Sequence, residues 1–138
     1  MAVAAKGPPL DIAVLVSSRR DVCFDPGDVA AIKTMATAEQ ERINLRGGIG
    51  GRPVALRFLD DQREASKSVT NMATALDNPQ LLAVIGLSGA DRAKAVFDAH
   101  AKRIVESGVP IIADLSVTSL FKELPNVFTT RSSQDQER

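Results

Sequence analysis

The chain turns back on itself within the stretch Ile43-Asn44-Leu45-Arg46-Gly47-Gly48-Ile49-Gly50-Gly51-Arg52-Pro53-Val54. A helical pattern precedes this stretch, and an apolar run typical of a strand follows it. Glycine adopts backbone conformations that other residues avoid, so the glycines let a long helix reverse into the adjacent strand with little loop. The stretch therefore predicts a helix followed directly by a strand.

The segments on either side repeat this order of strand and helix. Residues 11–16 form a short apolar run typical of a buried parallel strand, and Asp25-Pro26 supplies the cap and the first position of the next helix. A second helix is expected to begin after Arg63 and to end at Asn78-Pro79, and a third to begin at a cap formed by Ser88. Further strands are expected over residues 54–59, 81–85, 109–113 and 126–129, with Gly86 closing the third strand.

Strands that alternate with helices predict an α/β fold with a doubly wound, Rossmann-like parallel sheet that is covered on both faces. The expected strand order is 2-1-3-4-5, and the imperfect alternation of residues 54–59 suits an edge strand. Ligands of such sheets bind beyond the carboxyl ends of the strands. The functional loops are therefore expected over residues 17–25, 60–63, 86–91 and 114–118.

Composition excludes several classes of function. Basic and acidic residues balance at 17 each, and Trp and Tyr are absent, which argues against a nucleic-acid partner. No apolar run is long enough to span a bilayer, and the N-terminus does not read as an intact signal peptide. The composition is that of a globular domain.

The motifs of common enzymes are also missing from the sequence. The glycines follow a helix and not the first strand, which is the wrong context for a dinucleotide-binding turn, and no phosphate-binding loop occurs. His100 is the one histidine and has no metal ligands at suitable spacing, while the lone Cys23 has no neighbouring base. We therefore predict a binding module without catalytic residues, cofactor or metal.

Taken in order, these segments resemble the type I periplasmic binding proteins, the branched-chain amino acid or extracellular ligand-binding receptor group of ABC transporter substrate-binding proteins. Residues 44–54 are similar to the family's N-x-x-G-G-I-x-G-R-P-V junction, and residues 60–62 to its acidic turn. Residues 84–86 resemble its V-I-G strand end, residues 108–112 its G-V-P-x-I, and residues 126–128 its N-V-F.

The resemblance implies that residues 11–138 are the first segment of the N-terminal lobe of a two-lobed solute-binding protein, truncated near the first crossover between lobes. Residues 1–10 are expected to be a disordered or expression-derived N-terminus. Such a protein binds an amino acid or similar small carboxylate between its lobes and serves the membrane permease of an ABC transporter in the periplasm or another extracytoplasmic space. The alternatives are a ligand-sensing domain of a signalling receptor with the same fold, and a stand-alone α/β module without ligand.

The resemblance also implies where a ligand binds. Ser88 and Gly89 match the loop in which the family holds a ligand carboxylate with a hydroxyl and with backbone N–H groups at a helix N-terminus. Ser116 and Thr118 match or adjoin the second ligand loop, after the fourth strand. The sequence departs from the family there, because Val117 stands at its Thr and Ala113-Asp114 replaces its Ser-Pro.

The same residues could also have purely structural roles. Ser88 is expected to cap a helix in any case, and Ser116 and Thr118 could cap a short helix without touching ligand. The simplest interpretation of Asp60-Asp61 is a solvated turn before a helix. A lobe cut short is also expected to leave apolar surface exposed and to self-associate, for instance as a homodimer.

Overall fold

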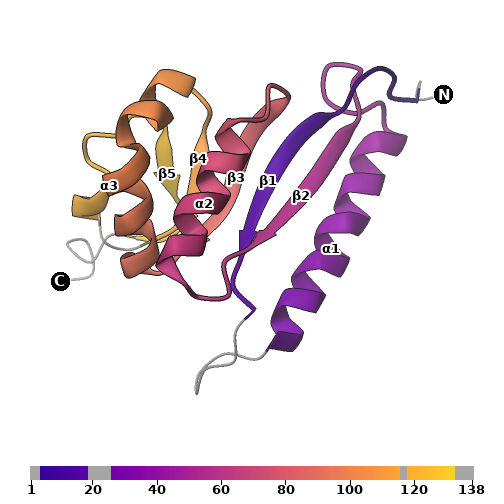
Figure 1. Ribbon diagram of the computed structural model, residues 1–138. Helices are drawn as coiled ribbons and strands as arrows, with labels where there is room; N and C mark the ends of the chain where they lie inside the picture. Colours follow the sequence, from indigo (N-terminus) through magenta and orange to yellow (C-terminus); the bar gives the residue numbers. More distant parts are fainter. Residues whose placement is uncertain (1–3, 19–25, 116–117, 133–138) are drawn as a thin grey trace.

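Strands and helices alternate along the chain in the computed structural model, which describes residues 4–18, 26–115 and 118–132 (Figure 1). The strands are β1 (Leu10–Val16), β2 (Val54–Asp60), β3 (Leu81–Ser88), β4 (Ile111–Asp114) and β5 (Val127–Thr129). The helices are α1 (Pro26–Leu45), α2 (Ala65–Leu76) and α3 (Ala90–Ser107), with a short 3-10 helix, η1 (Thr118–Leu120).

The five strands form one parallel sheet in the order β2-β1-β3-β4-β5. The sequence predicted this order, the parallel direction and the edge position of β2, and all three are confirmed. Each crossover carries the chain through a helix or loop to the far end of the next strand. The carboxyl ends of all five strands therefore lie along the same edge of the sheet.

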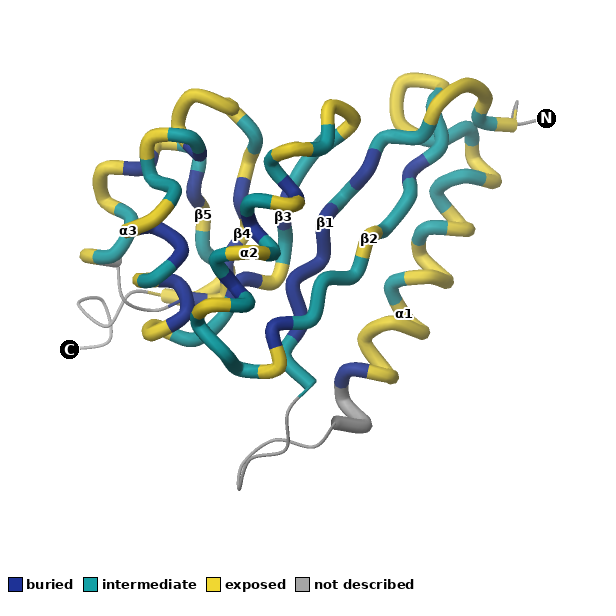
Figure 2. Tube along the Cα trace, viewed as in Figure 1, coloured by how far each residue is buried: buried dark blue, intermediate teal, exposed yellow. Residues whose placement is uncertain are grey.

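The two faces of the sheet are packed unequally (Figure 2). On one face α2 and α3 bury the larger core, in which Met72, Val96 and Ile104 are fully buried. On the other face α1 covers β1 and β2, where Val14, Val16 and Val29 form a smaller cluster. Side chains alternate between faces along a strand, so β1, β2 and β3 contribute to both clusters, whereas β4 and β5 contribute to the larger one.

A row of apolar side chains crosses the α1 face in register, one from each strand: Phe58, Val14, Ile85, Ile112 and Phe128. Beneath α1, Val14 is only 4% exposed, whereas Ile112 is 39% and Phe128 54% exposed. Parallel sheets are normally covered on both faces. Within the described chain, this face is covered over β1 and β2 and left open over β4 and β5.

The glycine junction between α1 and β2 forms as predicted. The Asn44 side chain bridges the two elements, because Val54 N donates to Asn44 Oδ1 at 2.7 Å and Asn44 Nδ2 donates to Val54 O at 2.9 Å. Gly48 has a φ of +71°, and a Cβ there would lie 1.9 Å from the carbonyl oxygen of Arg52. Lys6 N also donates to Gly51 O at 2.9 Å, so the chain before β1 lies against the junction.

Gly86 lies within β3 and not at its end, so the prediction that it closes the third strand was wrong. The strand pairing shifts register between Ile85 and Leu87, which marks a bulge, and β3 continues to Ser88. Gly86 has a φ of +93°, and a Cβ there would lie 2.5 Å from the carbonyl oxygen of Leu15 in β1. A glycine is therefore needed for β3 to bulge this close to β1.

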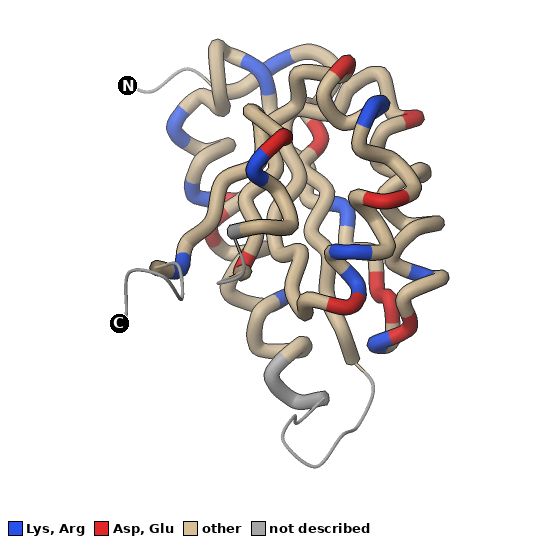
Figure 3. The backbone as a smooth tube through the Cα atoms, turned by 90° about the vertical axis from the view of Figure 1, so that its left-hand side faces the viewer, with Lys and Arg blue, Asp and Glu red and all other residues tan. Residues whose placement is uncertain are grey.

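Charged residues of both signs are distributed over the fold. Figure 3 shows Lys and Arg interspersed with Asp and Glu along the tube instead of being separated by sign. Among the helices of the described residues, none combines the length and the apolar character needed to cross a membrane.

Candidate functional site

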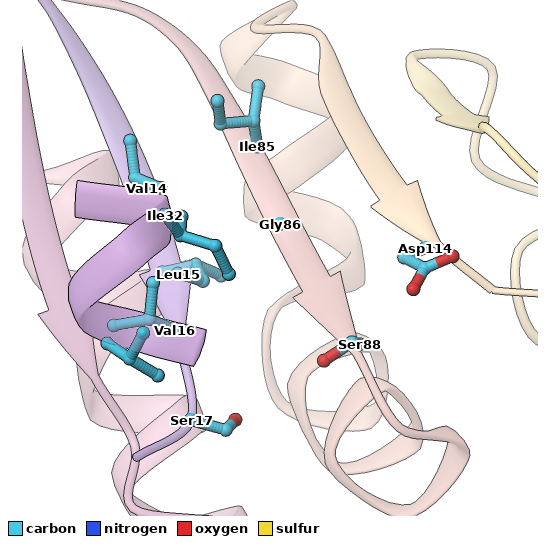
Figure 4. Close-up of a pocket in the computed structure, with 10 residues that line it drawn as sticks. Val14, Leu15, Val16, Ser17, Ile32, Ile85, Gly86, Ser88 and Asp114 are labelled. Carbon is cyan, nitrogen blue, oxygen red and sulfur yellow. The ribbon is translucent and has the colours of Figure 1, made fainter. Parts of the chain in front are cut away.

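A cavity of about 340 Å³ opens at the carboxyl ends of β1 and β3, on the face of the sheet that α1 covers (Figure 4). Its apolar lining comes from the strands and the first turns of α1: Val14, Leu15, Val16, Val29, Ile32 and Ile85. Gly86 completes the wall, and the polar lining is Ser17, Ser88 and Asp114 at the ends of three strands. This is the sheet edge at which doubly wound folds bind ligands.

The structure places Ser88 in the lining of the cavity, whereas Gly89 lies just beyond it. The residue at the N-cap position of α3 is Gly89, with no side-chain cap, so the prediction that Ser88 caps this helix was wrong. The bulge at Gly86 explains the difference, because it lets β3 continue through Ser88. The Ser88 hydroxyl consequently makes no hydrogen bond within the described chain.

The second predicted ligand loop is only partly described. Ser116 lies outside the described residues, and Thr118 begins η1 but its side chain is likewise outside the description. The ligand contacts expected of Ser88, Gly89, Ser116 and Thr118 remain predictions. Ser17 and Asp114 also line the cavity, and neither was predicted as a ligand contact, although both fall in loops that the strand pattern placed at the functional edge.

Next to the cavity, the carboxylate of Asp61 is buried, with the residue only 6% exposed. Its Oδ1 accepts hydrogen bonds from Ser17 Oγ at 2.6 Å and from the backbone N–H of Arg63 at 2.7 Å. Its Oδ2 accepts from Ser68 Oγ in α2 at 2.6 Å and lies 3.4 Å from Arg92 Nε in α3. One carboxylate therefore joins the end of β1 to α2 and α3.

Arg92 is also buried, with 7% of the residue exposed, and it packs against the turn at which α3 begins. A Cβ at Gly89 would lie 2.2 Å from Arg92 Nη2, so the guanidinium group occupies the space beneath that turn. The interpretation of Asp60-Asp61 as a solvated turn was therefore wrong for Asp61. No sequence signal separates this acid from an exposed one, because its partners Ser17 and Arg92 are distant in the chain.

Asp60 forms a second tie between β1 and β2. Ser18 donates to it from both its hydroxyl and its backbone N–H, and Gln62 N donates to Asp60 Oδ1 at 2.9 Å. Burial raises the pKa of Asp60, but these hydrogen bonds and the nearby Lys33 charge outweigh burial, so the pKa is lower than usual. Asp60 is therefore a carboxylate at neutral pH, and it fixes the backbone of Ser18, the residue after Ser17 in the cavity lining.

The sequence also singled out His100 and Cys23, and the structure describes only His100, which does not line the cavity. His100 Nε2 lies 3.0 Å from the carbonyl oxygen of Val69, which ties α3 to α2 and agrees with a packing histidine. Cys23 lies outside the described residues. Within residues 4–18, 26–115 and 118–132 there is no group of three or more His, Cys, Asp or Glu side chains that could hold a metal ion.

The sequence matches the family model described as periplasmic binding protein over residues 27–137. The match covers most of the chain, and the chain therefore belongs to the periplasmic binding protein family. These are binding proteins and not enzymes, in agreement with the motifs missing from the sequence. No curated protein sequence matches the chain at a significant level.

Solved structures with the same fold include transporter binding proteins. The isoleucine-bound branched-chain amino acid transporter substrate-binding protein of Streptococcus pneumoniae aligns over 91% of this chain and 34% of its own, with a TM-score of 0.71 at 18% identity. A substrate-binding periplasmic protein of Ralstonia solanacearum aligns over 92% of this chain and 35% of its own, with a TM-score of 0.74 at 19% identity.

A solute-binding protein of Rhodopseudomonas palustris in complex with 4-hydroxybenzoate aligns over 91% of this chain and 32% of its own, with a TM-score of 0.68 at 16% identity. The chain thus spans about a third of the length of these proteins. At these identities the likeness establishes the fold.

The Asp61–Arg92 pair should dominate the stability of this edge of the sheet. We expect Asp61→Asn to lower the free energy of unfolding by about 3–5 kcal/mol, because it leaves the buried Arg92 charge with the exposed Asp91 as its one remaining ion-pair partner among the described residues. Asp77→Asn is the matched control, since it breaks an Asp–Arg pair whose side chains are 69% and 42% exposed. The control should cost less than about 1 kcal/mol. Urea denaturation at neutral pH measures both, and equal losses would contradict a structural role for the buried pair.

Proposed function

We propose that the chain is the first segment of the N-terminal lobe of a two-lobed solute-binding protein of the ABC transporter type, and that its cavity forms one wall of the ligand site. The ligand would be an amino acid or a similar small carboxylate. The main support for the proposal is the cavity at the carboxyl edge of the sheet. The Ser88 hydroxyl lies in its lining and makes no hydrogen bond within the described chain.

The chemistry of this edge suits such a ligand. Ser88 can donate a hydrogen bond to a carboxylate, and Gly89 begins α3, a helix whose N-terminal N–H groups have no side-chain cap within the described chain. A helix N-terminus carries partial positive charge and favours anions. The apolar lining leaves room for an apolar ligand body, and the neighbours' ligands named above, isoleucine and 4-hydroxybenzoate, both carry a carboxylate.

Two observations support a larger, two-lobed protein. The chain spans only about a third of the length of its structural neighbours, and the α1 face of its sheet is left open over β4 and β5. Further segments would cover that face, and a second lobe would supply the opposite wall of the site. In that setting the protein would work outside the cytoplasm and pass its ligand to a membrane permease.

Ligand binding by this chain alone should be weak, because one wall supplies part of the contacts and cannot exclude water by closing. We expect dissociation constants in the millimolar range or weaker for amino acids and dicarboxylates. In an NMR titration the amide shifts should concentrate at residues 86–91 and 114–118. Ser88→Ala should reduce them, whereas Ser66→Ala, on the exposed side of α2, should not. Micromolar binding, or shifts centred elsewhere, would mean a complete module with a different site.

We also propose that copies of the chain associate through the open part of the α1 face, because its exposed apolar side chains favour association. Phe128→Ser should then lower the apparent mass at high concentration in light scattering, since Phe128 is 54% exposed in this face. Val105→Ser, at a 40% exposed site on α3, is the control and should leave the mass unchanged. A monomer at high concentration for the unmodified chain would refute the proposal.

A further inference from the structure

β2 is an edge strand of the sheet, and half of its backbone groups point away from β1. In a parallel ladder, alternate residues direct their N–H and C=O groups to opposite sides of the strand. Leu10 N donates to Pro53 O at 2.8 Å, and Asp61 N donates to Val16 O at 2.9 Å. Both bonds join an odd-numbered position at an end of β2 to β1. The even-numbered residues of β2 therefore face the free edge, where unpaired groups can pair with a strand of another chain.

Two amide side chains of α1 occupy this edge. Val54 N donates to Asn44 Oδ1 and Asn44 Nδ2 donates to Val54 O, so one amide satisfies both backbone groups, as a neighbouring strand would. Leu56 N donates to Gln40 Oε1 at 2.7 Å. Both amide side chains belong to half-buried residues of a helix that is otherwise mostly exposed. α1 thus runs alongside the edge strand and bonds to it (Figure 1).

The spacing of the two elements explains why this pair of amides fits. A helix rises about 1.5 Å per residue, so Gln40 and Asn44, which share one face, are separated by about 6 Å along α1. A strand rises about 3.3 Å per residue, so Val54 and Leu56 are separated by about 6.6 Å along β2. Successive turns of the helix therefore meet successive edge-facing residues of the strand.

A charge guards the edge beyond the two amides. By the same spacing, Ala36 comes opposite Phe58, and its side chain has no hydrogen-bonding group. Lys33 Nζ lies 5.7 Å from the centroid of the Phe58 ring, which brings a cation to this part of the strand. Charged side chains, and lysine especially, oppose the pairing of exposed edges.

We infer that α1 uses Gln40 and Asn44 to close the β2 edge against a second copy of this chain. The inference goes beyond the proposed function and does not depend on ligand binding. Two free β2 edges would be identical surfaces and could pair with each other across a twofold axis. The two amides occupy the backbone groups that this pairing needs, and they hold α1 where a second β2 would have to lie.

Gln40→Ala should open the edge while Asn44 still holds the junction between α1 and β2. The background is Phe128→Ser, which removes the other association surface proposed above. In light scattering at high concentration, adding Gln40→Ala should raise the apparent mass toward that of a dimer. Thr37→Ala is the control, because Thr37 is an exposed residue of the same helix, and it should leave the mass unchanged. In dilute Gln40→Ala, the Leu56 amide should exchange its hydrogen faster than in the unmodified chain.

Leu56→Pro identifies the surface through which the opened chain associates. Proline has no N–H group and is tolerated in an edge strand where that group would face outward. The backbone bond that it removes is the one to Gln40, so the ladder with β1 keeps its hydrogen bonds. Added to Gln40→Ala, it should return the apparent mass to that of the monomer.

An unchanged mass on adding Gln40→Ala would overturn the inference, and so would an equal rise on adding Thr37→Ala. A rise that persists with Leu56→Pro would place the association elsewhere and overturn it too. If Leu56→Pro does not fold, the masses of the Gln40→Ala and Thr37→Ala variants and the exchange of the Leu56 amide still decide.

Discussion

The buried carboxylate of Asp61 is the interaction on which the carboxyl edge of the sheet depends. A charge taken out of water costs several kcal/mol unless it is paired and hydrogen bonded. Asp61 meets both conditions, with hydrogen bonds from Ser17, Ser68 and the Arg63 backbone and an ion pair to Arg92. Because these partners belong to different elements, satisfying one charge also fixes where β1, α2 and α3 end or begin.

The same hydrogen-bond and ion-pair network orients polar groups at the candidate site. Asp61 accepts the hydrogen bond of the Ser17 hydroxyl, which leaves that oxygen free only to accept at the cavity. Asp61 also pairs with Arg92, whose guanidinium group packs against the turn at Gly89. The bulge at Gly86 then carries β3 far enough for Ser88 to reach the rim beside Asp114. Packing on the α2 and α3 face thus determines the chemistry of a cavity on the opposite face.

Fold and site differed in how far the sequence could predict them. Strand order followed from the alternation of apolar segments, and the α1–β2 junction followed from its glycines, because both depend on neighbours in the chain. The burial of Asp61 did not follow, because its partner Ser17 lies 44 residues away. The cap assigned to Ser88 failed for a related reason, since only the pairing of β3 with β4, a strand distant in the sequence, shows that Gly86 is a bulge and not a strand end.

We propose that the cavity between α1 and the ends of β1 and β3 forms one wall of a solute site. Intermolecular NOEs between the methyl groups of added L-leucine and those of the protein test this directly. We predict NOEs to Val29 and Ile32 of α1 and to Val14 and Ile85 of the sheet, which line the cavity. NOEs confined to the exposed apolar residues Ile112 and Phe128, or to the outer surface of α3, would contradict it.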